Sequence, residues 1–304
     1  MGADVFGYGA EVVILCKIME VNIIKTEGKP LEKLIETVSS AIGTLYKPTQ
    51  IRKEAKANAE ALIMQKEAEA KGMIIIADTN DEIIERTKKR IALQEINRQM
   101  NIEDVADRSI KYLSKNVSDT PIDFDWKNRF FNKVQDINSD ELKEIWAKIL
   151  GNEVYNPGNV SIRALELLSN LDKKEAELFE KLASMSVFNH SVLKVNNENS
   201  YDQFGITFSD MLVLEAAGLI HSNASLNITY PTIPPFNIAI IQFGNKIISV
   251  KKEGENKIVF NQTSFTHAAG ELINILKFEH NYNYLSYFIE EKSKQGYVFQ
   301  YINQ

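Results

Sequence analysis

The feature of this sequence that most constrains its fold is a long stretch without helix breakers. Residues 49–120 contain no proline, and Gly72 is their only glycine, while Ala, Glu, Lys, Arg, Ile and Gln fill most other positions. Strong helix formers summed over such a window predict one or two very long helices. At about 1.5 Å per residue, roughly 65 helical residues extend on the order of 100 Å, several times the width of a compact domain. A helix of that length needs a partner to cover it, most simply a second copy of the chain.

Apolar residues in this stretch predict where the long helices meet a partner. We expect these positions to mediate oligomerisation: Leu62, Ile76, Ile84, Ile91 and Ile96. The apolar stripe changes phase between residues 73–76 and 83–84, which favours a hinge near Gly72 or Asn80 over a regular coiled coil.

The segment before the long helices predicts a shorter helix that begins at Pro30. Its apolar residues alternate in steps of four and three: Leu31, Ile35, Val38, Ile42 and Leu45. The polar side mixes Glu and Lys, which favours burial against protein over association with an anionic membrane. The charged run ERTKKR at 85–90 has acidic neighbours, so a solvated helix face is favoured over a nucleic-acid contact.

Residues 123–186 carry the clearest local signals. We interpret Trp126, Phe130 and Trp146 as anchors of a helical core. Asn138 with Glu141 predicts a capping box at the start of a helix that Gly151 ends.

Two further helices follow, with candidate caps at Ser161 and at Asp172. Asp172 and Glu175 have the spacing of a second capping box.

The last third changes to short elements of mixed type. Helices are predicted at 209–218, 266–278 and 284–294, and strands at 226–230, 236–243, 247–252, 257–261 and 297–302. This order of helix, hairpin and helix resembles a winged-helix unit. A DNA-reading helix needs cations or amides for base edges and phosphates, whereas helix 209–218 offers Asp210 and Glu215 and no cation.

Composition and motifs argue against enzyme chemistry and point to a reducing compartment. Cys16 is the only cysteine, which excludes an intramolecular disulfide framework and fits the cytoplasm. The net charge of −6 disfavours a surface that binds nucleic acid throughout. The four histidines lack metal-ligand spacing, and the sequence contains no phosphate-binding glycine loop and no nucleophile elbow. We therefore expect no cofactor and no metal site.

Three phrases carry a resemblance to a known family: PLEKLIETVSSAIGTLYKPTQIRKEAKANAEA, DFDWKNRFFNKVQDINSDELKEIWAKILGNEVYNPGNVSIRALELLSNLDKKEAELFEKL and FGITFSDMLVLEAAGLI. They resemble an uncharacterised bacterial family, domain of unknown function 2806, over residues 20–276. The resemblance implies no activity and no catalytic residues. The order of the helical segments is also similar in layout to the abortive-infection alpha proteins, which implies a role in phage defence.

We predict a mainly α-helical protein in four parts. These are a leader at 1–29 that could precede the native start, a helical oligomerisation arm at 30–116, a central helical domain at 117–200 and an α+β winged-helix-like module at 201–304. The leading hypothesis is a non-enzymatic, self-assembling bacterial protein that acts as a sensor or effector in phage defence. A winged-helix DNA-binding regulator dimerised by the arm stays open, as does a hydrolase or nuclease whose carboxylates meet only in the fold. The partners expected are a second copy of the chain first, then another protein, with nucleic acid and membranes less favoured.

Overall fold

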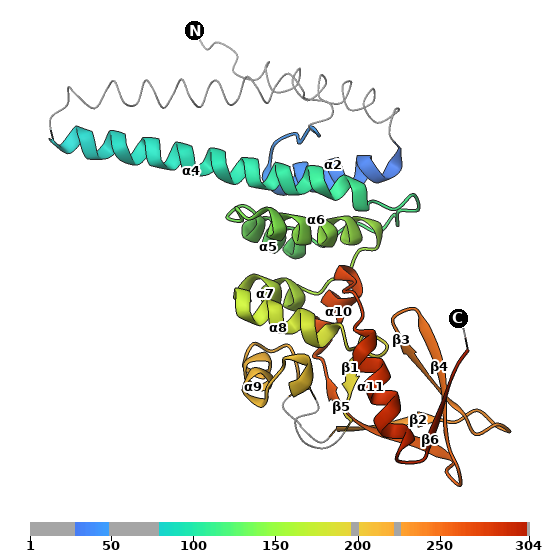
Figure 1. Cartoon of the computed structure of the whole chain (residues 1–304). Helices are drawn as coiled ribbons and strands as arrows, with labels where there is room; N and C mark the ends of the chain where they lie inside the picture. The colour runs from blue at the N-terminus through green and yellow to red at the C-terminus, as the bar shows by residue number, and fades with distance from the viewer. Residues whose placement is uncertain (1–27, 49–78, 196–200, 222–225, 303–304) are drawn as a thin grey trace. The chain divides into compact units, whose positions relative to one another are not determined.

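The computed structural model describes residues 28–48, 79–195, 201–221 and 226–302 (Figure 1). The chain divides into two compact units, Met1–Asn159 (unit 1) and Val160–Gln304 (unit 2). Unit 1 is helical where it is described, and unit 2 combines helices with two small antiparallel sheets. The predicted helix-rich fold with a mixed α+β C-terminal part is confirmed. The predicted four-part division stays a prediction, and most of its leader lies outside the described residues.

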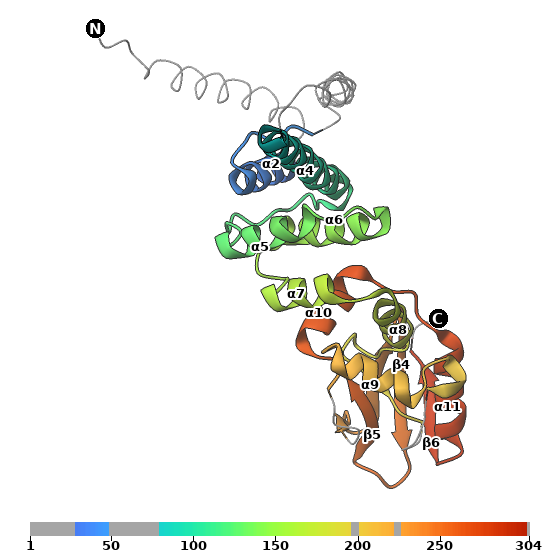
Figure 2. The ribbon, with the colours of Figure 1, turned by 90° about the vertical axis from the view of Figure 1, so that its left-hand side faces the viewer.

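Unit 1 consists of two layers of helices (Figures 1 and 2). One layer holds α2 (Lys29–Ile42) and α4 (Thr79–Ser109), and the other holds α5 (Phe124–Val134) and α6 (Asp140–Tyr155). The 3₁₀ turn η1 (Ile110–Tyr112) directly continues α4.

The predicted stripe of α2 is covered within unit 1. Leu31, Ile35 and Val38 are buried on the side that packs against α5 and α6. The helix ends at Ile42 because Gly43 adopts a left-handed conformation with φ of 72°. Leu45 therefore lies beyond the helix, contrary to the predicted stripe.

An aromatic cluster forms the core between α5 and α6. The rings of Trp126 and Phe130 stack with centroids 4.9 Å apart, and the edge of Phe130 meets Trp146 at 5.4 Å. All three predicted core anchors are buried. Offset and edge-to-face pairs of this kind fix ring orientations as well as burying apolar area.

The N-caps of the central helices lie at the predicted residues, except for one that lies one residue later. The N-cap of α6 is Ser139, whose hydroxyl accepts a hydrogen bond from the Leu142 amide, so the predicted cap at Asn138 is wrong by one residue. Asp172 forms the predicted capping box with Glu175 at α8 (Lys173–Ala183), and Ser161 caps α7 (Ile162–Asn170) as predicted. Each cap satisfies an amide that the first helical turn would leave unpaired.

Gly151 does not end its helix, which corrects a sequence prediction. It lies inside α6, which continues to Tyr155. A Cβ atom at Gly151 would lie 2.7 Å from the Cβ of Tyr112 and 3.2 Å from the Ser109 carbonyl oxygen. The glycine therefore allows α6 to approach the end of α4 and η1 closely. Its role is close packing of helices and not helix termination.

Unit 2 contains further helices around its two sheets. The helices and 3₁₀ turn are α7, α8, η2 (Asp202–Phe204), α9 (Phe208–Ala216), α10 (His267–Leu276) and α11 (Tyr282–Ser293). The strands are β1 (Ser191–Leu193), β2 (Leu226–Pro231), β3 (Ala239–Phe243), β4 (Lys246–Lys252), β5 (Lys257–Ser264) and β6 (Tyr297–Tyr301). One sheet has the order β1-β5-β2 and the other β3-β4-β6, with every neighbouring pair antiparallel.

The turns of unit 2 have different roles in the two sheets. Gly244 and Asn245 join β3 to β4 in a tight hairpin, with Phe243 opposite Lys246. The turn at 253–256 instead leads from one sheet to the other, since β4 pairs with β3 and β6 while β5 pairs with β1 and β2. The three-residue strand β1 was not predicted, because so short a run carries no period.

Two helical glycines give a matched test of the close approach at Gly151. Alanine normally stabilises a helix interior by about 0.5–1 kcal/mol relative to glycine. At Gly151 the added Cβ would clash, so Gly151→Ala should lower the free energy of unfolding by about 1–3 kcal/mol. Gly270 in α10 is the control, because its nearest neighbours would lie 3.6 Å from an added Cβ. Urea unfolding should show Gly270→Ala as stable as the wild type or more so, and a stabilised Gly151→Ala would contradict the packing role.

Candidate functional site: the exposed part of α4 and its anchor

The helix α4 is much longer than the surface that holds it. Its 31 residues extend about 45 Å. Ile102, Val105 and Ala106, near its end, are buried and pack on α5 and α6. No residue from 82 to 100 is buried, and this segment extends past the other described helices of unit 1 (Figure 1). We call residues 82–100 the exposed part of α4.

The exposed part of α4 presents large apolar side chains to solvent. Of the predicted oligomerisation residues, Ile84, Ile91 and Ile96 are 53%, 50% and 37% exposed. Leu62 and Ile76 lie outside the described residues, as does Gly72, while Asn80 lies at the start of α4. The structure adds three exposed positions that the prediction omitted: Ile83, Leu93 and Met100.

Five of these six side chains form two stripes on opposite sides of the helix, and Ile83 lies on neither. Ile84 and Ile91 are seven residues apart and share a side. Leu93, Ile96 and Met100 share another side, because their spacings are three and four. Ile91 and Met100 are nine residues apart, about two and a half turns, so the two stripes face away from each other.

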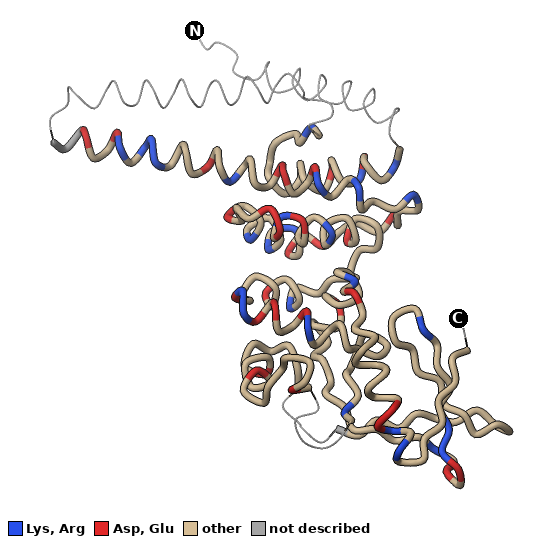
Figure 3. Tube along the Cα trace, viewed as in Figure 1, with Lys and Arg blue, Asp and Glu red and all other residues tan. Residues whose placement is uncertain are grey.

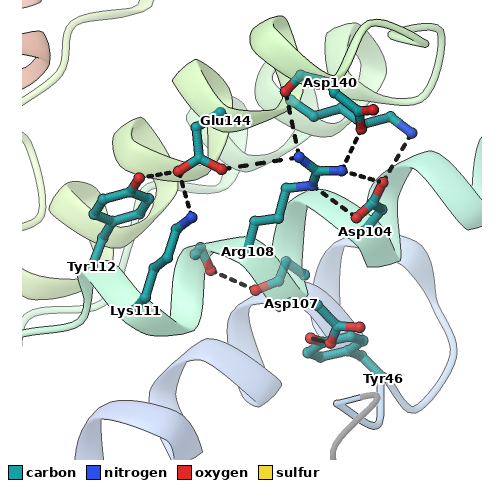
Figure 4. Close-up of polar contacts among 11 residues, drawn as sticks. Tyr46, Asp104, Asp107, Arg108, Lys111, Tyr112, Asp140 and Glu144 are labelled. Atoms are coloured by element: carbon teal, nitrogen blue, oxygen red, sulfur yellow. Dashed lines mark hydrogen bonds and ion pairs between the residues drawn. The ribbon is translucent and has the colours of Figure 1, made fainter.

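Charged residues from α4 and α6 hold the end of α4 in place (Figure 4). The Arg108 guanidinium donates from Nε to Asp104 Oδ1 at 2.9 Å, within its own helix. It also contacts the carboxylates of Asp140 and Glu144 on α6, the first directly and the second at 3.9 Å. Lys143 of α6 reaches back to Asp104 Oδ2 at 3.0 Å. We call these five residues, with Lys111 and Tyr112, the Arg108 cluster.

The Arg108 cluster keeps its groups charged. The hydrogen bonds that Arg108 donates to Asp104 and Asp140 raise the pKa of Arg108 above its usual value despite partial burial. Burial alone would raise the pKa of Asp104, but the hydrogen bonds from Arg108 and Lys143 outweigh it and lower that pKa. Glu144 behaves in the same way, since the hydrogen bonds that it accepts from Lys111 and Tyr112 outweigh burial. Each acid of the cluster therefore has a cation partner, which leaves no open pair of carboxylates for acid–base chemistry.

Other polar contacts also hold the end of α4 against unit 1. Asn101 is buried and donates from Nδ2 to the Gln135 carbonyl at 2.9 Å. Arg98 donates to Asp136 Oδ1 at 2.9 Å in the same connection between α5 and α6. Tyr46, after α2, donates its hydroxyl hydrogen to Asp107 Oδ1. The anchored end of α4 thus contacts three parts of unit 1.

Two cations of the basic run at 85–90, Arg86 and Lys88, are paired with acidic neighbours on the same helix. Arg86 lies 3.7 Å from Glu82, and Lys88 lies 2.9 Å from Glu85. Charges of both signs occur along α4 (Figure 3). Such a mixed surface gives no continuous track for phosphates.

Neither a metal site nor a membrane-spanning helix is found in the described residues. In these ranges, no three His, Cys, Asp or Glu side chains come close enough together to hold a metal ion. Within the same part of the chain, no helix combines the length and the apolar character needed to cross a membrane.

The charge pairs of the Arg108 cluster predict a pH dependence. A lowered pKa of Glu144 in the folded protein stabilises the fold above about pH 4.3, the unfolded value, and this gain is lost as pH falls through the lower folded pKa. Glu144→Gln should therefore reduce the free energy of unfolding by about 1 kcal/mol at pH 7 and by little at pH 2–3. Urea unfolding followed by tryptophan fluorescence measures this in unit 1, which contains both tryptophans of the chain.

The exposed carboxylate Asp125 provides the control for this measurement. Asp125→Asn should lower stability far less than Glu144→Gln at pH 7. A deficit of Glu144→Gln that is equally large at pH 7 and pH 2–3 would contradict the electrostatic role.

Comparison with known proteins gives one match. The model of the family described as "Protein of unknown function (DUF2806)" matches residues 85–289, which begins inside α4 and ends inside α11. The resemblance expected from residue 20 therefore starts later and ends later than predicted. No curated protein and no solved structure matches the chain. Since the family model covers well over half of the chain, the chain belongs to the DUF2806 family of unknown function.

Proposed function

We propose that the protein is a non-enzymatic, self-assembling protein whose copies meet through the exposed part of α4. The observation that carries this proposal is the presence of two apolar stripes on opposite sides of one helix. A neighbouring helix covers a stripe about 100° wide, so it covers one side only. Two stripes therefore require two neighbours.

A second copy of the chain is the favoured neighbour. The sequence predicts one further long helix in the same chain, before Gly72, and that helix could cover one stripe at most. The other stripe is left for a different molecule. Isolated large apolar side chains are common on surfaces, but a row of them along a helix that projects from its unit is typical of a helix-packing interface.

The Arg108 cluster supports the same proposal. An interface on a projecting helix works only if the helix keeps its direction, since a helix pivoting at its base would present its stripes at varying angles. Charged hydrogen bonds to α6 and the buried Asn101 fix that base. Fixing the helix in advance lowers the entropy cost of association.

A role as a sensor or effector of bacterial phage defence, in the cytoplasm, extends this proposal. Its support is the likeness in layout to abortive-infection alpha proteins, which is an analogy of segment order and not of a site. The neighbouring genes provide an independent test. A gene set with known defence systems beside it supports the role, and a constant metabolic neighbourhood contradicts it.

The two alternatives have less support. A winged-helix DNA-binding regulator would need cations on its reading helix, whereas α9 carries Asp210 and Glu215 and no cation. A hydrolase or nuclease would need carboxylates that share a metal or a water, whereas those of the Arg108 cluster pair with cations.

Light scattering behind size exclusion tests the assembly. At micromolar concentration the wild type should have a mass that is a multiple of 34.5 kDa. The double variant Ile91→Asp with Met100→Asp places a charge on each stripe and should shift the mass to that of a single chain. Arg90→Asp is the matched control, because Arg90 is exposed on the same part of α4, lies about a quarter turn away from both Ile91 and Met100, and the substitution changes the net charge by as much as the double variant does.

Circular dichroism should show that all three proteins keep their helices. A wild type that elutes with the mass of one chain overturns the proposal. An assembly that the double variant leaves unchanged places the interface outside the exposed part of α4 and also overturns it.

A further inference from the structure

Unit 2 contains a cavity that self-assembly does not use. Its volume is about 870 Å³, within the range of small-molecule sites. The β3–β4 turn, the segment before β1, the end of α10 and the start of α11 surround it. The lining residues that matter below are Phe188, Asn189, Gln242, Asn274, His280 and Tyr282.

The backbone around this cavity is held in unusual conformations. Phe188, Asn189 and Lys277 have φ values of 49°, 58° and 53°, and all three line the cavity. Among the described residues only one other non-glycine position, Asn237, has a positive φ. Left-handed conformations cost energy for residues with a side chain and gather at sites where the fold needs a particular shape. Three of the four therefore occur where the cavity is formed.

Of the four primary amides that line the cavity, Asn189, Gln242 and Asn274 have hydrogen-bonding capacity to spare. Asn189 Nδ2 donates to Asn274 Oδ1 at 2.9 Å, and Gln242 Nε2 donates to the Gly244 carbonyl at 3.1 Å. The Asn274 amide nitrogen and the amide oxygens of Asn189 and Gln242 have no further partner among the described residues. A primary amide holds a donor and an acceptor side by side, so it can pair with a ligand edge that carries the same two groups.

His280 adds a buried polar atom. Its Nδ1 is inaccessible to solvent and has no hydrogen-bond partner in the described parts of the chain. Its ring lies 5.1 Å from that of Phe243, and a Cβ at Gly244 would come within 2.6 Å of His280 Cδ2. Glycine is therefore required at position 244 for two reasons: the hairpin turn has a positive φ of 58° there, and His280 lies too close for a side chain. Burial lowers the pKa of His280, and the nearby Ser184 carbonyl opposes this only in part.

Aromatic rings and balanced charge complete the lining. Phe188 and Tyr282 are 40% and 41% exposed, which leaves ring surface open for stacking. Tyr282 is held by a hydrogen bond of 2.6 Å from its hydroxyl to Asn245 Oδ1. The charged lining residues are Lys277 and Glu279, one of each sign, and the lining contains no arginine. A strongly anionic ligand such as a phosphate group would find one cation and one repelling carboxylate.

We infer that this cavity binds an uncharged, planar heterocycle whose edge carries amide-like donors and acceptors, namely a nucleobase, free or in a nucleoside. The primary amides pair with its edge, and the open aromatic rings stack on its face. This inference rests on unit 2 alone and does not depend on the proposed assembly.

Isothermal titration calorimetry of the full chain tests the inference. Adenosine, guanosine, cytidine and uridine are titrated separately, with the free bases, ribose and the 5′-monophosphates as further arms. At least one nucleoside should bind with a dissociation constant below about 1 mM. A free base that binds as well as its nucleoside identifies the base as the recognised part. Ribose should not bind, and a 5′-phosphate should not strengthen binding.

Matched variants locate the site. Asn274→Leu should weaken binding by about tenfold or more, because it removes one paired amide. Gln242→Leu is a second variant at an exposed position, in case the first one misfolds. Asn283→Leu is the control, since Asn283 is exposed on α11 and does not line the cavity. The inference is overturned if no nucleoside or base binds, if ribose binds as tightly as a nucleoside, if the phosphate dominates affinity, or if folded Asn274→Leu and Gln242→Leu proteins bind like the wild type.

Discussion

The guanidinium of Arg108 lies between α4 and α6 and meets carboxylates from both helices. Because its partners on α6 are more than 30 residues away in the sequence, these contacts exist only when the two helices are packed together. Gly151 makes that packing close, and the aromatic cluster of Trp126, Phe130 and Trp146 gives α6 a fixed surface on its other side. The direction of the exposed part of α4 follows from these contacts, and so does the presentation of its apolar stripes.

Local signals in the sequence predicted local structure well. The cap at Asp172 was identified because a capping box depends on residues three positions apart, and the cap at Ser161 because serine is favoured at helix N-caps. All described strands of unit 2 except β1 were identified by composition and turn residues, while their division into two sheets was not, since pairing partners are set by tertiary packing. Gly151 was misinterpreted for the same reason: a glycine that ends a helix and one that receives a neighbouring helix look alike in sequence.

The two candidate sites differ in how much of them the sequence revealed. Ile84, Ile91 and Ile96 were selected from periodicity, and all three are exposed on α4. The Arg108 cluster has one readable signal, the spacing of four between Asp104 and Arg108, whereas Asp140 and Glu144 could be assigned to it only from the fold. The cavity of unit 2 left no readable signal, because its amides come from three separate segments and its glycine at 244 resembles any hairpin glycine.

The helix α4 also has consequences for motion. Its last third is largely buried and multiply bonded, while residues 82–97 rely on their own backbone hydrogen bonds and on exposed ion pairs that contribute little. An isolated helix of that length is marginal in water. In a single copy, its amide hydrogens should therefore exchange through local fraying, in a gradient that ends where Asn101 enters the core. Association would remove that gradient. The amide exchange rates along α4 therefore distinguish a single chain from an assembly.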